Sequence, residues 1–74
     1  MNKREIDTYL DSVIRRKKGF YYKGKKYNGV AFLDDCLEIH TNDYKDVVYI
    51  NYEDIKRIEN VTVGNELHKT IFTI

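Results

Sequence analysis

The chain has 74 residues, a formal net charge of +1 and one cysteine, Cys36. This length predicts a single domain, residues 1–74, whose small core favours oligomerisation as a further source of stability. A lone cysteine excludes an internal disulfide and is typical of a reducing compartment. The N-terminus has no apolar signal segment, and no apolar run approaches the ~20 residues that cross a membrane. We therefore expect a soluble, cytoplasmic domain with no membrane partner.

The charges are divided unevenly along the chain. Residues 1–30 carry nine Lys or Arg and three Asp or Glu, a net charge of +6, whereas residues 31–74 carry four and nine, a net charge of −5. This division predicts one face for an anionic partner such as nucleic acid and another face for a protein. The alternative is that the two halves interleave in the folded chain and their charges cancel.

Residues 3–18 have the pattern of an amphipathic helix. Apolar residues recur on one face at helical spacing, and they are Ile6, Tyr9, Leu10, Val13 and Ile14. Asn2, with Glu5 three residues later, predicts a capping box at the start of the helix. The cations at residues 15–18 would lie at the negative end of the helix dipole, and Gly19 would end the helix in a left-handed conformation.

After Gly19 the pattern changes to that of β-strands. The expected strands are 20–22, 26–33, 36–41, 47–52, 56–63 and 68–74, joined by short turns such as Asp34-Asp35. Glycines within strand-like sequence mark bends, so we expect the strand that contains Gly29 to be long and bent. The sequence therefore predicts the α+β class, with helix 3–18 and then, over 19–74, a five- to six-stranded antiparallel barrel of SH3-like or Sm-like form.

Three segments of the chain match a known pattern in the same order. The predicted helix ends in Arg15-Arg16, the segment 24–29 has a glycine at each end and is followed by Asp35, and residues 47–58 read as a strand, a tight turn and a strand. Together these segments resemble the Sm/LSm fold, in its bacterial Hfq form.

The resemblance covers roughly residues 5–60. It implies a small β-barrel, a ring of six or seven subunits joined by strand pairing, and binding of single-stranded RNA. Cys36 and Leu37 stand where Hfq-type proteins carry the polar and aromatic residues of a uridine pocket, so contact with RNA is expected at basic residues instead. Residues 52–59 also resemble a strand-end segment of bacterial pleckstrin-homology-like domains, which are longer and end in a helix.

A basic and aromatic stretch runs from the end of the predicted helix into the first strands. Cations bind phosphates and aromatic rings stack on unpaired bases, so this composition predicts contact with single-stranded RNA. The predicted nucleic-acid-binding residues are Arg15, Arg16, Lys17, Lys18, Tyr21, Lys23, Lys25 and Lys26. Tyr21 belongs to this set because strand alternation places it opposite Phe20 and Tyr22 and exposes its ring. Alternatively, residues 15–18 are the cations usual at a helix end, which leaves the lysines of residues 23–26 unexplained.

Most of the acidic residues lie in the second half of the chain. They include Asp34, Asp35, Glu38, Asp43, Asp46, Glu53, Asp54 and Glu59. One interpretation is docking to a basic protein or mimicry of nucleic-acid charge. The protein would then be a small phage- or bacterium-encoded inhibitor or adaptor that acts through this acidic face or a barrel edge. The other interpretation is ordinary solvated turns and strand faces.

The sequence carries no motif for catalysis, for a cofactor or for a metal ion. Cys36 and His40 lie four residues apart on an expected strand, a separation too long for one zinc ion. No base is identifiably paired with the Cys36 thiol, and Asp34-Asp35 fits a turn better than a pair of catalytic carboxylates. We therefore expect a non-enzymatic protein without cofactor or metal, assembled as a homo-oligomer, with single-stranded RNA or a host protein as its partner.

Overall fold

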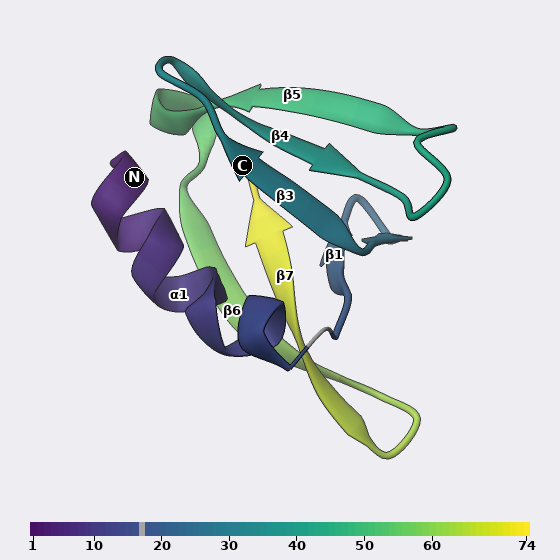
Figure 1. Ribbon diagram of the computed structural model, residues 1–74. Helices are drawn as coiled ribbons and strands as arrows, with labels where there is room; N and C mark the ends of the chain where they lie inside the picture. The colour runs from purple at the N-terminus through teal and green to yellow at the C-terminus, as the bar shows by residue number, and fades with distance from the viewer. Residues whose placement is uncertain (17) are drawn as a thin grey trace.

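One α-helix, one short 3-10 helix and seven strands make up the computed structural model, which describes residues 1–16 and 18–74 (Figure 1). In chain order the elements are α1 (Lys3–Arg15), β1 (Phe20–Tyr22), β2 (Lys25–Tyr27), β3 (Gly29–Phe32), β4 (Cys36–His40), β5 (Val47–Asn51), the 3-10 helix η1 (Tyr52–Asp54), β6 (Arg57–Val63) and β7 (Glu66–Phe72). The strands form two sheets, in the orders β2-β1-β7-β6 and β3-β4-β5. The expected α+β class is confirmed, with more strands than expected.

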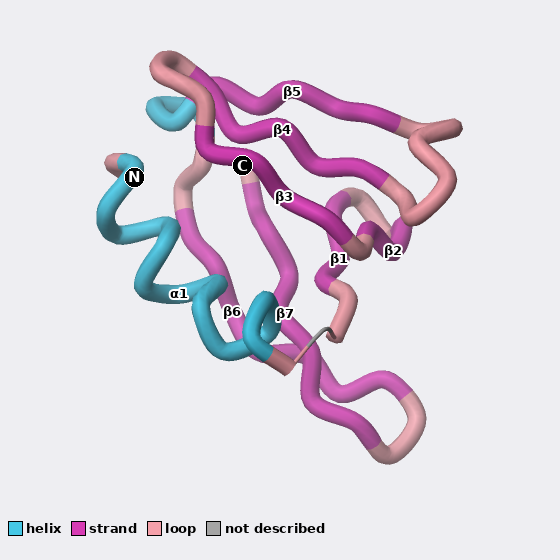
Figure 2. Tube along the Cα trace, in the orientation of Figure 1, coloured by secondary structure: helices cyan, strands magenta, loops and turns pink. Residues whose placement is uncertain are grey.

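α1 lies along one side of the two sheets and packs against both of them (Figure 2). α1 contacts β3 of one sheet and β7 of the other. The core between these layers consists of Ile6, Leu10, Val13, Phe20, Tyr27, Leu37, Ile39, Ile50, Tyr52, Ile55, Ile58 and Ile71. Leu37 and Ile39, two residues apart on β4, are both fully buried, as side-chain alternation along a strand requires for one inward face. None of the helices in the described part of the chain is long and apolar enough to span a membrane.

The start of α1 follows the sequence prediction. The Asn2 side chain accepts a hydrogen bond from the Glu5 amide at 2.8 Å, and the Glu5 carboxylate accepts one from the Asn2 amide at 3.3 Å. This pair is the expected capping box, which satisfies two of the amide groups left open at a helix start. The ammonium group of Met1 also donates to the carbonyl oxygens of Tyr52 and Ile55, which fastens this end of the helix to the segment between β5 and β6.

The end of α1 differs from the prediction. The helix ends at Arg15 with Arg16 as its C-cap, three residues before the expected end at residue 18. Gly19 is not among the glycines with a left-handed φ. It instead permits a close approach, because a Cβ at Gly19 would lie 2.4 Å from the Lys26 side chain and 3.0 Å from the Tyr27 carbonyl oxygen. The glycine therefore serves the packing of β2 against the helix–strand connection.

The expected long strand 26–33 is two strands in different sheets. β2 ends at Tyr27, β3 begins at Gly29, and the chain passes from one sheet to the other at Asn28. The bend was predicted correctly, but the continuity of the strand was not. Gly29 is required here because the His40 ring lies against its backbone, where a Cβ would be 2.0 Å from His40 Nε2.

One strand pairing contradicts the expected antiparallel order. β1 pairs with β7 in parallel, and Phe20 lies level with Lys69 in this register. The antiparallel hairpin of β6 and β7 turns at Gly64, whose φ is +63°, and extends away from the rest of the molecule (Figure 1). Local alternation of side chains does not encode strand direction, so a contact between residues this far apart in sequence escaped the prediction. The remaining strands begin and end within two residues of their expected positions.

Candidate nucleic-acid interface

The predicted cations at the end of α1 have different surroundings. Arg15 pairs with Asp11 one helical turn earlier, with its Nε 3.1 Å from an Asp11 carboxylate oxygen, and both side chains are largely exposed. Arg16 is exposed and Lys18 is half-buried, and neither has an ion pair within residues 1–16 and 18–74. Lys17, also predicted to bind nucleic acid, lies outside the described residues.

A groove of about 220 Å³ separates the end of α1 from the β6–β7 hairpin. Its polar lining consists of Ser12, Arg16, Lys18, Asn60, His68 and Lys69. Three of these residues are cations, and they come from two segments distant in sequence. We call this feature the basic groove. Lys69 was not among the predicted residues, because the parallel pairing of β1 with β7, which a local pattern does not encode, brings that lysine beside the end of the helix.

The histidine of the groove is held by three neighbours. His68 is 4% exposed, and its Nδ1 lies 3.1 Å from the Gly19 carbonyl oxygen, to which the Nδ1–H tautomer donates. Its Nε2 lies 3.4 Å from a carboxylate oxygen of the exposed Glu66. The imidazole and the Tyr21 ring pack nearly perpendicular to each other, with 5.4 Å between the ring centroids. His68 thus joins the hairpin to the segment that follows α1.

Tyr21 and Lys26 lie on the face of the β2-β1-β7-β6 sheet opposite Lys69, because Phe20, which precedes Tyr21, is level with both Tyr27 and Lys69. They are cross-strand partners in the β1–β2 register, so their side chains share that face. Tyr21 is half-buried against His68, whereas an exposed ring was expected. Lys26 is exposed and lies close to Gly19. The half-buried Tyr21 ring therefore shares its face of the sheet with the exposed Lys26 side chain.

The lysines of the β1–β2 turn lie at the far end of this hairpin from the groove. Lys23 and Gly24 both have positive φ values, 51° and 78°, as in the tight turns that suit hairpins. The ammonium group of Lys23 lies 5.5 Å from the centre of the Tyr22 ring. These contacts give Lys23 a local structural role and separate it from the basic groove.

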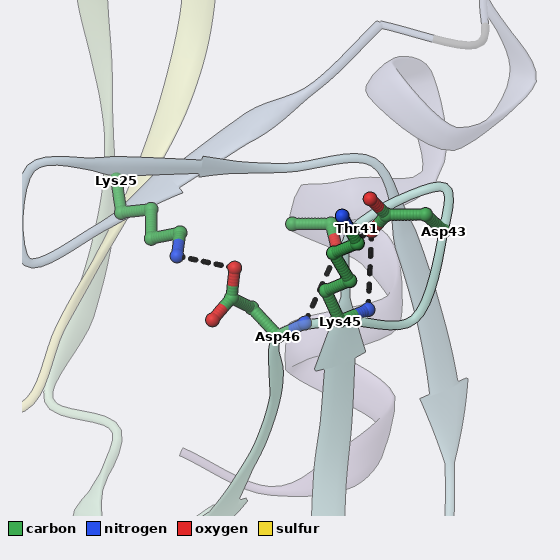
Figure 3. A network of polar contacts seen from close by, with 5 residues as sticks. All are labelled: Lys25, Thr41, Asp43, Lys45 and Asp46. Carbon is green, nitrogen blue, oxygen red and sulfur yellow. Dashed lines mark hydrogen bonds and ion pairs between the residues drawn. The ribbon is translucent and has the colours of Figure 1, made fainter.

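Lys25 is engaged within the fold. Its Nζ pairs with a carboxylate oxygen of Asp46 at 2.5 Å, and this hydrogen bond raises the pKa of Lys25 (Figure 3). Next to it, Asp43 accepts hydrogen bonds from the Thr41 hydroxyl at 2.7 Å and from the Lys45 amide at 3.1 Å, which lower the pKa of Asp43. The Lys25–Asp46 pair connects β2 to the loop before β5, so it bridges the two sheets.

The acidic residues have different surroundings in the fold. Asp46 pairs with Lys25, and Glu59 pairs with Arg57 at 2.5 Å. Asp34, Asp35 and Glu53 line a shallow hollow of about 460 Å³ beside the end of β5. Part of the charge of the two halves is therefore paired across the fold, which was the alternative considered for the uneven charge distribution.

The arrangement of cations in the basic groove can hold an anion. The cations of the basic groove offer phosphate contacts, and the Tyr21 ring offers a surface for stacking. In the part of the chain that the structure describes, no group of three or more His, Cys, Asp or Glu is placed to hold a metal ion. No protein-family model, no curated protein and no solved structure matches this chain.

Proposed function

We propose that the protein is a non-enzymatic, cytoplasmic RNA-binding protein with an Sm-like barrel, and that it grips single-stranded RNA in the basic groove. The observation that carries this proposal is the convergence of Arg16, Lys18 and Lys69 from two distant segments on one groove. Lys26 and Tyr21 offer a second surface on the other face of the sheet, beside His68 of the groove. Phosphates bind in the groove, and one unpaired base stacks against Tyr21.

The position of Lys69 distinguishes this proposal from a purely structural explanation. Cations at the end of a helix stabilise it by offsetting the negative end of the dipole, which accounts for Arg15 and Arg16. Lys69 lies on β7 and Lys26 on β2, so neither belongs to that helix end. A phosphate bound among Arg16, Lys18 and Lys69 in the basic groove offsets their mutual repulsion and accounts for their convergence.

Single-stranded RNA suits the groove better than a duplex does. A volume of about 220 Å³ accommodates a phosphate and part of its sugar but not the face of a double helix. Tyr21 provides a stacking surface only for a base that is free of its own helical neighbours. The predicted set of contact residues is therefore revised. Arg16, Lys18, Tyr21 and Lys26 stay in it and Lys69 joins it, whereas Lys25 is already paired with Asp46.

The test measures fluorescence anisotropy of labelled A-rich and U-rich oligonucleotides at low salt. Arg16→Glu combined with Lys69→Glu is expected to abolish binding, since both side chains reverse charge within the basic groove. Lys3→Glu is the matched control, because Lys3 lies at the other end of α1, where a carboxylate is favoured by the dipole. Binding by the control and not by the double variant supports the proposal. Absence of binding by the wild type contradicts it.

A protein-binding inhibitor or adaptor is the second candidate function. It is favoured by the hollow that Asp34, Asp35 and Glu53 line, since three carboxylates there suit a basic partner. In that case the wild type binds no oligonucleotide at low salt. The wild-type protein instead binds a basic peptide, and the double variant Asp34→Lys with Asp35→Lys loses that binding.

A further inference from the structure

The two sheets have four edge strands, and three of them are protected against pairing with another chain. β2 has three residues, two of which are Lys25 and Lys26. β6 carries Arg57 and Glu59 on its outer side, and β3 lies against α1. Short length, charged side chains and a covering helix are the usual ways in which proteins block an exposed edge. These three edges are therefore poor sites for strand pairing.

The fourth edge, β5, has none of these protections. Its sequence, Val47–Asn51, contains no charged residue, no proline and no glycine. Tyr49 at its centre is 63% exposed and Val47 is 37% exposed. Within the described part of the chain, β4 is its only hydrogen-bonded neighbour. Neutral β-branched and aromatic residues on an open edge are typical of a strand that pairs with another strand.

The backbone of β5 is also correctly oriented for such pairing. The Thr41 amide donates to the Asp46 carbonyl oxygen at 3.1 Å, in the same register that pairs β4 with β5. Hydrogen bonding alternates along an antiparallel pair, so Val48 and Ile50 bond to β4. The other three residues of β5 direct their N–H and C=O groups towards the open edge. An incoming strand would meet a regular row of unpaired donors and acceptors.

We propose that β5 pairs antiparallel with β5 of a second copy, about a two-fold axis that passes beside Tyr49. In this register Tyr49 lies opposite Tyr49 of the second copy, and Val47 lies opposite Asn51. All three positions have outward-directed backbone groups, so each of these opposed pairs exchanges hydrogen bonds across the interface. The opposed tyrosines add an aromatic contact on the outer face of the combined sheet.

Charge at the two ends of β5 favours a second copy with this orientation. Lys45 precedes the strand and Glu53 follows it, and both residues are exposed. No ion pair involves either side chain among the residues that the structure describes. Antiparallel self-pairing brings the Lys45 end of each copy to the Glu53 end of the other, whereas parallel pairing would bring like charges together. The edge is therefore complementary to itself.

This dimer differs from the ring that the Sm/LSm resemblance implies. A two-fold contact uses the same surface on both copies, so it is complete after two chains and leaves no free β5 edge. A ring requires two different edges on each subunit. The inference is independent of RNA binding, since β5 belongs to the sheet that does not line the basic groove.

Light scattering coupled to size-exclusion chromatography tests the dimer on the full chain. The wild type is expected at twice the chain mass of 8.9 kDa. Tyr49→Lys puts two ammonium groups opposite each other and is expected to give a monomer with unchanged circular dichroism, because this side chain is mostly exposed. Val63→Lys, at an exposed apolar position on β6, is the matched control and stays dimeric. A monomeric wild type, a six- or seven-fold mass, or a Tyr49→Lys variant that stays dimeric overturns the proposal.

A charge exchange tests the orientation without changing β5 itself. Lys45→Glu alone and Glu53→Lys alone each place like charges opposite one another and are expected to weaken dimerisation several-fold. An equimolar mixture of the two variants restores opposite charges at both ends of the pair, so it is expected to form the mixed dimer. A mixture that dimerises no better than either variant alone overturns the antiparallel register.

Discussion

The two sheets of this small protein differ in how far their charged residues are paired. In the β2-β1-β7-β6 sheet Lys25 and Arg57 have ion-pair partners, whereas Lys69 lies in the basic groove, whose described lining includes no acidic residue. In the β3-β4-β5 sheet and its loops, Asp43 and Asp46 are held by hydrogen bonds or ion pairs within the fold. The difference indicates that strand pairing decides which charges of a run in the sequence stay without a partner among the described residues.

Three features hold these different sheets together, and each can be broken separately. α1 packs against both sheets, the chain crosses between them at Asn28 and Gly29, and Lys25 pairs with Asp46 across them. Their expected contributions to stability fall in that order, because burial of apolar side chains outweighs an exposed ion pair.

Leu10→Ala is expected to have the largest effect. Leu10 is fully buried on the face of α1 that packs against both sheets. Truncating a buried leucine costs about 2–5 kcal/mol, which is comparable to the ~3–5 kcal/mol that a core of this size supplies. Urea denaturation followed by circular dichroism should therefore find the variant largely unfolded without denaturant. Tyr9→Ala, at a 46% exposed neighbouring position, should remain folded, and equal losses for the two variants would contradict the assigned core face.

Gly29→Ala is expected to have an intermediate effect at the crossing between the sheets. The added Cβ would lie 2.0 Å from His40 Nε2, so the imidazole has to move from its stack with Tyr44. Overpacking of this kind costs about 1–3 kcal/mol of the free energy of unfolding. The same substitution in a His40→Ala background should cost less, since the obstructing ring is gone. Equal costs in both backgrounds would show that His40 is not the obstruction.

The Lys25–Asp46 bridge is expected to have the smallest effect, visible as a dependence on pH. The hydrogen bond from Lys25 to Asp46 raises the pKa of Lys25 above its usual 10.5. The bridge therefore stabilises the folded chain fully below that usual value, and its contribution is lost as the pH rises through the raised pKa. The difference in urea midpoint between the wild type and Lys25→Met should shrink to zero on alkaline titration. In an Asp46→Asn background Lys25→Met should have no such pH-dependent effect, and a persistent one would exclude Asp46 as the cause.

Local sequence patterns were sufficient for the elements that depend on near neighbours. The capping box at Asn2, the inward side chains of Leu37 and Ile39, and the position of β5 all follow from periodicity and capping rules. Each of these features depends on residues that lie close together along the chain, so a single sequence contains enough information to locate them.

The candidate site depends on contacts that a single sequence does not encode. Lys69 reaches the basic groove through the parallel pairing of β1 with β7, and Lys25 is paired with Asp46 through the approach of the two sheets. The end of α1 at Arg15 was also missed, because Gly19 was expected to end the helix and instead makes room for β2. Strand direction and sheet approach are tertiary properties, and they decide which of the predicted cations remain available.

The salt dependence of oligonucleotide binding tests the basic groove most directly. Three phosphate contacts predict a slope of about −2 for the logarithm of the association constant against the logarithm of salt concentration, at about 0.7 per contact with a single strand. Lys69→Ala should reduce this slope by about 0.7, whereas Lys3→Ala should leave it unchanged. A Lys69→Ala variant with the slope and affinity of the wild type would contradict the role assigned to the groove.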